Sequence, residues 1–234
     1  MSTDGEAHDG RAVILGRIRR ALGPGRAAPP VSRDPVPDAP VPRDYAPASP
    51  ESGTPELLAL FAERMEGTHA TVRRTRSDAV AAAVAAVAED RGLRRVIAPP
   101  GLDPGWLPRN AIEWIGDDPP LTTAQVEGAD AVLTAATVAA ADSGTLVLDG
   151  GPGQGRRVLS LLPDAMIVVL RAGQVVADLP AAVARMDPTR ALTVVSGPSA
   201  TVDIELRRVD GVHGPRELDV LLVDDAKSDL SARR

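Results

Sequence analysis

The 234-residue chain contains no cysteine. Disulfide bonds, thiolate-bound zinc, iron–sulfur clusters held by its own thiolates and a cysteine nucleophile are therefore excluded. A chain without disulfides fits a reducing compartment. No segment approaches the ~18 apolar residues of a membrane-spanning helix, and arginines interrupt the short apolar run near the N-terminus, unlike in a signal peptide. These absences predict a cytoplasmic protein without a membrane span.

Aromatic residues are also scarce, with two Trp, one Tyr and one Phe in the whole chain. Ala, Val and Leu must therefore fill the core. The net charge is −6 and no face is rich in Lys and Arg, which binding to a phosphate backbone requires. Because the aromatic side chains that stack on single strands are missing too, the sequence argues against nucleic-acid binding.

Apolar spacing divides the chain into four segments. Ile14, Ile18 and Leu22 share one face of an amphipathic helix predicted over residues 10–22, which is either a frayed tail or a tethered helix that docks on this protein or a partner. Nine prolines over residues 23–50 predict an extended linker, because proline lacks a backbone N–H. The predicted helical tail, linker, α/β domain and C-terminal tail span residues 1–22, 23–53, 54–226 and 227–234.

Helical and strand patterns alternate within the domain. Thr54 and Ser77 are predicted to cap helices, and a further helix is expected over residues 179–186. One strand is expected over residues 131–139, and the turn at residues 142–144 joins it to a second at 146–148. Uniformly apolar strands that alternate with helices are typical of a mainly parallel sheet covered on both faces. The predicted fold class is therefore α/β.

The glycine-rich segment "DGGPGQGRR", residues 149–157, follows a strand and precedes a predicted helix at residues 155–162. Backbone N–H groups of such a loop bind anions, and Arg156 and Arg157 add positive charge. The segment is neither a Walker loop nor a dinucleotide fingerprint. It is either a carboxylate or phosphate site or a flexible surface loop with solvated arginines.

The stretch "ADSGT" supplies a second candidate site. Gly144 permits a tight turn between two strands. The polar side chains of Asp142, Ser143 and Thr145 then lie at a strand end, where open α/β sheets usually bind ligands. The alternative is a hairpin turn without a ligand.

The C-terminal third carries further candidates. Asp203 and Glu205 share one face of the predicted strand "TVDIEL", as an acid/base pair or as solvated acids on a half-exposed strand. His213, in "GVHGP", is suited to proton transfer near neutral pH or is bonded to backbone. The loop "GPSAT" offers Ser199 and Thr201 to an anion. No G-x-S-x-G elbow or second acidic cluster is present, so neither a serine hydrolase nor a metal site is predicted.

Several of these segments together resemble the LUD-domain family, and within it the lactate-utilisation protein C type. "AADSGTLVL" resembles the family's Ala-Glu-Thr-Gly-Thr signature, and "RVLSLLPDAMIVVL" resembles its Arg-x-x-Ser-Leu-Leu-Pro segment and following strand. "SGPSATVDIE" and "GVHGPREL" are similar to its two C-terminal motifs, in the expected order. The resemblance covers roughly residues 55–225.

The resemblance implies a three-layer α/β/α Rossmann-like sandwich of the sugar-phosphate isomerase/CoA transferase type. It also implies a role in oxidising L-lactate to pyruvate, with iron–sulfur clusters in sister subunits. Arg157 matches the family's arginine and becomes the main anion-binding candidate. Asp142 stands where the family has Glu and is one methylene shorter, which argues against a covalent carboxylate role and leaves a hydrogen-bonding role open.

The leading hypothesis is a component of a cytoplasmic iron–sulfur L-lactate utilisation system. It would bind a small anion and its partner subunits without a cofactor or redox centre of its own. One alternative is a stand-alone enzyme that uses Asp142, Glu205 or His213 on a sugar phosphate or CoA thioester. The other is a non-catalytic assembly or regulatory module. The predicted anion-binding residues are Ser143, Gly144, Thr145, Arg157, Ser199, Thr201 and Asp203.

Overall fold

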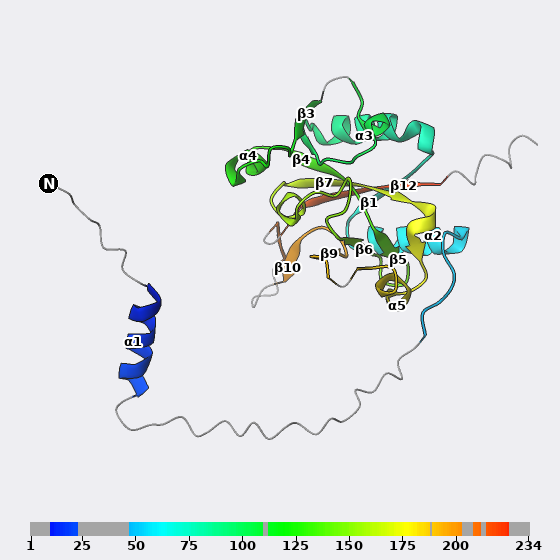
Figure 1. Ribbon diagram of the computed structural model, residues 1–234. Coiled ribbons are helices and arrows are strands. Elements are labelled where there is room, and N and C mark those ends of the chain that lie inside the picture. Colours follow the sequence, from blue (N-terminus) through cyan, green and yellow to red (C-terminus); the bar gives the residue numbers. More distant parts are fainter. Residues whose placement is uncertain are drawn as a thin grey trace, which may run out of the picture. The chain divides into compact units, whose positions relative to one another are not determined.

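The computed structural model divides into two units, Met1–Tyr45 and Ala46–Arg234 (Figure 1). The residues that it describes are 10–22, 47–109, 112–187, 189–202, 208–211 and 214–224. The described part of the first unit is helix α1 (Gly10–Leu22), with the bounds predicted from its apolar spacing. None of the helices in these described ranges is long and apolar enough to cross a membrane.

A six-stranded parallel sheet forms the centre of the second unit. Its strands are β1 (Thr71–Thr75), β2 (Arg95–Ala98), β3 (Glu113–Gly116), β4 (Ala131–Ala135), β7 (Ala165–Arg171) and β12 (Glu217–Val223). Their spatial order is β1-β12-β7-β4-β2-β3. The chain runs outward from β2 to β3, returns to β4 on the other side of β2, and continues away from it. Ligands of open α/β sheets bind at the carboxyl ends of strands beside such a reversal.

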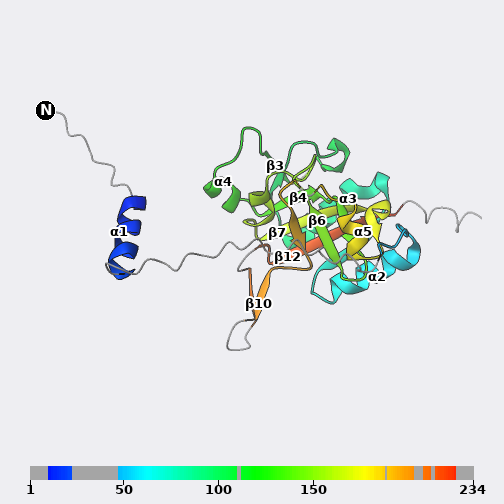
Figure 2. The same cartoon turned by 60° about the horizontal axis from the view of Figure 1, so that its bottom comes forward.

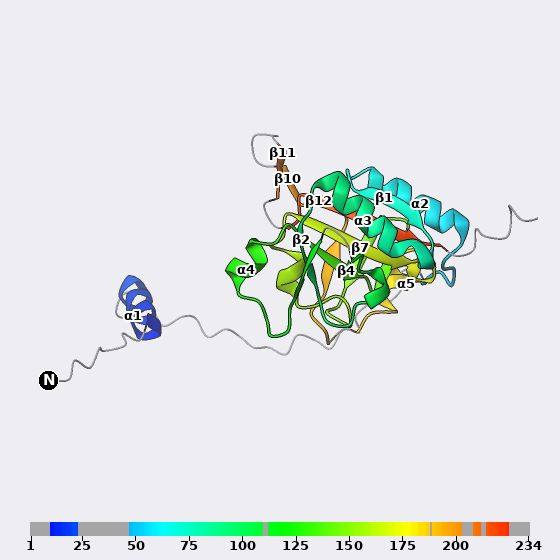
Figure 3. The ribbon, with the colours of Figure 1, turned by 90° about the horizontal axis from the view of Figure 1, so that it is seen from above.

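Both faces of this sheet are buried, as its uniformly apolar strands predict. Val168 and Leu170 of β7 pack on one side, and Ile167 and Val169 pack on the other. Figures 1 and 3 show a helix on each side of the sheet. These helices are α2 (Pro55–Glu66) and α3 (Val80–Arg91). The α/β fold class is therefore confirmed.

A second, four-stranded sheet lies on the same side as α2 and was not predicted (Figure 2). Its strands, in spatial order, are β8 (Val175–Val176), β5 (Val138–Ala140), β6 (Thr145–Leu148) and β9 (Thr193–Val195). Helix α5 (Leu179–Val183) covers its outer face through Ala181 and Ala182. This side of the domain therefore consists of a helix and a sheet together.

The second sheet exists because the strand predicted over residues 131–139 is two strands. The carbonyl of Ala136 accepts a hydrogen bond of 2.6 Å from Gln174 Nε2, and Thr137 N donates to Val147 O at 2.9 Å. The chain thus leaves the main sheet after Ala135 and pairs elsewhere. No glycine or proline marks this break, so the continuous apolar run gives no local signal of it.

Three helix predictions need correction. The segment predicted as a helix over residues 155–162 forms a single 3-10 turn at Arg157–Ser160, because it is confined between Gly155 and Pro163. The helix predicted over 179–186 ends at Val183. Ser77 begins a 3-10 turn, and the α-helix starts three residues later at Val80.

Other short elements complete the domain. Thr54 caps α2 as predicted, and its side chain accepts a hydrogen bond from Leu57 N. The remaining elements are α4 (Thr123–Glu127), β10 (Ala200–Val202) and β11 (Arg208–Asp210), with 3-10 turns at Pro104–Trp106 and Ala172–Gln174.

The end of the predicted linker belongs to the domain. Ser49 N donates to Asp178 Oδ2 at 3.0 Å, and Asp178 caps α5. Gly53 N donates to Val175 O at 2.8 Å, and Ser52 forms a bridge with Val176. Residues 49–53 therefore run along β8 instead of linking freely.

Candidate functional site

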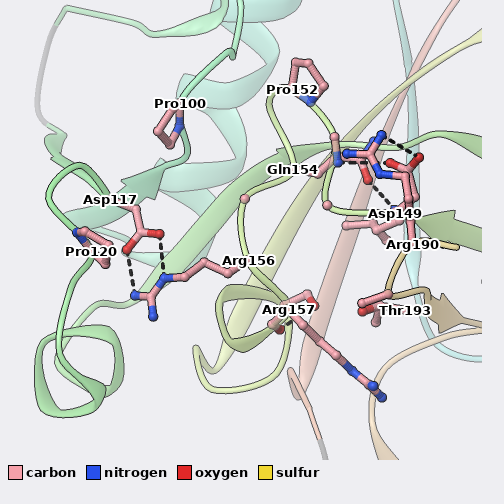
Figure 4. Close-up of a pocket in the computed structure, with 16 residues that line it drawn as sticks. Pro100, Asp117, Pro120, Asp149, Pro152, Gln154, Arg156, Arg157, Arg190 and Thr193 are labelled. Atoms are coloured by element: carbon pink, nitrogen blue, oxygen red, sulfur yellow. Dashed lines mark hydrogen bonds and ion pairs between the residues drawn. The ribbon is translucent and has the colours of Figure 1, made fainter.

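The glycine-rich segment lines an open cleft of about 710 Å³ (Figure 4). Pro100, which follows β2, and Asp117, which follows β3, form another part of its wall. Since these strands are parallel, both residues lie at the carboxyl edge of the main sheet, beside the reversal between β2 and β4. The cleft therefore occupies the position where this class of fold binds ligands.

Gln154 and Gly153 hold the glycine-rich segment in place. The Gln154 side chain accepts from Asp149 N at 2.7 Å and donates to Thr137 Oγ1 at 2.9 Å. Gly153 O accepts from Ala135 N, and Gly153 N donates to Pro100 O, both at 2.9 Å. The segment is thus tied to the ends of β2 and β4, so the wall of the cleft is formed before any ligand arrives.

Arg156 forms a paired hydrogen bond with the carboxylate of Asp117. Its Nε and Nη2 donate to the two carboxylate oxygens at 2.8 and 2.7 Å, and Leu121 N donates to the same carboxylate at 2.9 Å. The hydrogen bond from Arg156 holds the pKa of Asp117 below its ordinary range, against the opposing effect of burial. The same bond raises the pKa of Arg156. The pair clamps the glycine-rich segment to the chain after β3.

A second acid, Asp149, engages Arg190. The Arg190 Nη1 atom lies 3.3 Å from Asp149 Oδ2, and Asp149 Oδ1 accepts from Gly151 N at 3.0 Å. Arg157 is exposed, and its guanidinium has no hydrogen bond or ion pair within the part of the chain that the structure describes. Figure 4 shows its side chain extending away from the Arg156–Asp117 pair. Of the three arginines in the cleft, Arg157 therefore has its charge uncompensated by a described acid.

Sequence reasoning missed Asp117 and Arg190. Asp117 directly follows the short apolar segment "EWIG", and an acid at a strand end is a signal of a ligand site in open α/β sheets. Arg190 carries no local signal, because its partner Asp149 is distant in the sequence.

The "ADSGT" residues lie away from the cleft. The turn of Asp142, Ser143 and Gly144 precedes β6, whereas the glycine-rich segment follows it. A Cβ on Gly144, where φ is +60°, would lie 2.7 Å from Arg64 Cβ at the end of α2. Since α2 leads into the amino end of β1, the turn sits on the amino side of the main sheet. The prediction that it lies at a ligand-binding strand end needs correction, because β6 belongs to the second sheet.

The other predicted residues are also separate from the cleft or outside the described residues. Thr145 Oγ1 lies 2.8 Å from Ser196 Oγ. Ser199 N donates to Pro215 O at 2.7 Å, which joins Ser199 to the segment before β12, and Thr201 pairs with Val209 in the β10–β11 hairpin. Asp203, Glu205 and His213 lie outside the described residues. Among the described members of the predicted anion-binding and catalytic residues, Arg157 alone lines the cleft, next to Arg156.

Asp117→Asn is expected to lower the free energy of unfolding by about 1 kcal/mol at neutral pH. The cost is modest because solvent screens a pair whose arginine side chain is 40% exposed. A carboxyl whose pKa is lowered by folding stabilises the folded state at pH values above its ordinary pKa of 3.8. This contribution is lost as the pH falls through the folded-state pKa. The difference between wild type and variant should therefore close in acid.

Urea unfolding at about pH 7 and about pH 3 measures this difference. Asp118→Asn is the matched control, since Asp118 is the exposed neighbour, and it should leave stability unchanged. A deficit in the Asp117 variant that stays constant into acid would show that packing, and not charge, is responsible.

Comparison with known proteins places the chain in a family. The LUD domain family matches residues 58–223. Lactate utilization protein C of Deinococcus radiodurans is 37% identical, over 95% of this chain and 100% of that protein. Lactate utilization protein C of Halalkalibacterium halodurans is 32% identical, over 92% of this chain and 98% of that protein.

A solved structure supports the same assignment. The crystal structure of a DUF162 family protein from Deinococcus radiodurans superposes with a TM-score of 0.61 at 34% identity, covering 72% of this chain and 97% of that one. Family match, near full-length relatives and fold agree with the motifs found in the sequence. The chain belongs to the LUD-domain family.

Proposed function

We propose that this chain is a component of a lactate-utilisation system that binds a small anion at the glycine-rich cleft. Two relatives that match almost their whole length are named Lactate utilization protein C, which supports the pathway. The cleft supports the binding role, because it combines a prearranged loop with an uncompensated positive charge.

The guanidinium of Arg157, which has no described partner, is the main support for anion binding at the cleft. A guanidinium recognises carboxylate and phosphate groups by paired hydrogen bonds, and its planar shape is lost in a lysine. Arg156 and Arg190 already have carboxylate partners at 2.7 and 3.3 Å. An incoming anion would therefore meet Arg157 first, while the two ion pairs keep the surrounding wall in position.

The composition of the chain supports placing the redox centre in another subunit. Oxidation of L-lactate to pyruvate releases two electrons and two protons. This chain has no cysteine to hold an iron–sulfur cluster through thiolates. We place the electron acceptor, an iron–sulfur cluster, in a partner subunit, as the family resemblance implies, and give this chain the binding of the anion and of the partner.

Arg157→Gln is expected to weaken anion binding at least tenfold, which corresponds to about 1.4 kcal/mol. The probes are phosphate, L-lactate and pyruvate, titrated into the full chain by calorimetry and by thermal unfolding. An anion at a hundred times its dissociation constant should stabilise the wild type by roughly 2.7 kcal/mol. Arg94→Gln is the charge-matched control, since Arg94 is exposed beside β2 and does not line the cleft.

Three results would contradict the proposal. Equal weakening by Arg94→Gln would show a general charge effect instead of a site. Stability unchanged by all three anions would favour the assembly-module alternative. Lactate-dependent reduction of a dye by the isolated chain would overturn the placement of the redox centre in a partner.

A further inference from the structure

Helix α1 exposes a concentrated set of large apolar side chains. Val13, Ile14, Leu15 and Ile18 are 42%, 60%, 37% and 49% exposed. Its thirteen residues also include four arginines and no acid, in a chain whose net charge is −6. A helix this short is marginal in water without a surface to pack against. The sequence of α1 therefore indicates that it packs against a surface that is both apolar and negatively charged.

The arrangement of these side chains restricts the kind of surface. Successive residues of a helix are turned by 100°, so Val13, Ile14 and Leu15 spread over roughly 200° of one turn. Ile18 lies one turn further along, below Ile14. In the sequence, Leu22 continues the face of Ile14 and Ile18, so the apolar face runs along the helix and is broadest in its first half. A helix that binds in a protein groove presents a narrow stripe of anchors, without apolar residues on both sides of it such as Val13 and Leu15.

Three of the four arginines occupy the second half. Arg17, Arg19 and Arg20 are all exposed. Arg17 and Arg20, three residues apart, lie on one side of the helix, and Arg19 is turned by about 100° from Arg20. Together they form a positive collar next to the apolar patch. Pairing with α1 of a second copy would bring together two helices that each carry four arginines and no acid, and like charges repel. The surface that α1 binds must therefore carry negative charge over a wide area, and it does not need a specific groove.

We propose that α1 anchors this protein to an anionic lipid surface. A bilayer interface accepts a broad apolar patch into its headgroup region and attracts arginines through acidic headgroups. The patch of Val13, Ile14, Leu15 and Ile18 enters the interface, and the collar of Arg17, Arg19 and Arg20 lies among the headgroups. Binding is reversible, because one short helix buries little apolar area and relies on charge for the rest.

Co-sedimentation of the full chain with lipid vesicles tests the proposal. We expect binding to vesicles that contain phosphatidylserine, none to phosphatidylcholine vesicles, and a steep loss with added salt. Replacing Arg17, Arg19 and Arg20 with Gln should weaken binding about fivefold per residue, or about a hundredfold for all three.

Two double variants separate the apolar contribution from net charge. Ile14→Glu with Ile18→Glu should abolish binding. Leu179→Glu with Val183→Glu makes the same change in charge at two apolar residues of α5 that are 45% and 57% exposed, and it should bind nearly as the wild type does. Thermal unfolding of each variant checks that the domain stays folded.

The proposal is overturned if the full chain does not sediment with phosphatidylserine vesicles, which would leave an acidic protein surface as the occupant of α1. It is also overturned if the α1 and α5 double variants lose binding equally, or if neutral and anionic vesicles bind alike.

Discussion

Gly155→Ala is expected to destabilise the domain by about 3 kcal/mol and to abolish anion binding at the cleft. Gly155 has φ of +68°, and a Cβ there would lie 2.7 Å from Leu159 Cδ1 and 2.9 Å from Pro99 Cβ. Leu159 is fully buried and the proline ring is rigid, so neither can give way without displacing the core. The cost combines the strain of a positive φ, about 1 kcal/mol, with overpacking of about 1–3 kcal/mol.

Gly150→Ala is the matched control in the same loop. Its φ of +69° is nearly identical, but the nearest atom to a Cβ there, Gly155 O, is 3.4 Å away. We therefore expect a loss of about 1 kcal/mol, from backbone strain alone. Urea unfolding gives both values, and titration with phosphate gives the effect on binding. Equal losses in the two variants would show that the close approach to Pro99 and Leu159 does not matter.

Arg91→Met is expected to cost about 3 kcal/mol at neutral pH, because it leaves the Asp219 carboxylate buried. Asp219 is 1% exposed on β12. Arg91 Nε donates to its Oδ2 at 3.1 Å, whereas Arg73 Nε lies 3.6 Å from Oδ1 and makes no hydrogen bond to it. Removing one partner of a buried pair costs several kcal/mol, and the 26% exposure of Arg91 places this site near the lower end of the range of about 3–5 kcal/mol.

The pH dependence of this variant identifies the cause. Burial raises the pKa of Asp219, and the two arginines oppose that rise. A carboxyl whose pKa is raised by folding stabilises the folded state while it is protonated. This contribution is lost as the pH rises from the ordinary pKa of 3.8 through the folded-state pKa. Arg91→Met raises that pKa further. The deficit relative to wild type should therefore be small in acid and grow with pH.

Urea unfolding between about pH 4 and about pH 7 measures the deficit. The double variant Arg91→Met with Asp219→Asn should recover most of it at neutral pH, since no buried carboxylate remains. A deficit that is independent of pH and is not recovered by Asp219→Asn would mean that Arg91 acts through packing of its side-chain stem.

Local patterns in the sequence were sufficient for much of the fold. The spacing of Ile14, Ile18 and Leu22 predicted the bounds of α1, and Thr54 marked the start of α2. Uniformly apolar strands separated by helices predicted the parallel sheet. The glycine-rich segment that lines the cleft was also predicted as a candidate anion site, because glycines and arginines after a strand are a local signal.

The arrangement of the site depended on contacts between distant segments. The break after Ala135 comes from pairing with β6 and from Gln174, and the engagement of Arg156 comes from Asp117, thirty-nine residues away. These partners leave no periodic or turn signal near the residues they affect.

Composition and short-range spacing are therefore sufficient for the α/β class, the family motifs, the absence of thiolate ligands and the presence of a positively charged loop. Contacts within the folded domain are needed to show that "ADSGT" packs on α2 instead of beside that loop, and that Arg156 and Arg190 are paired whereas Arg157 has no described partner. Strand pairing and ion pairing across the fold select among residues that look equivalent along the chain.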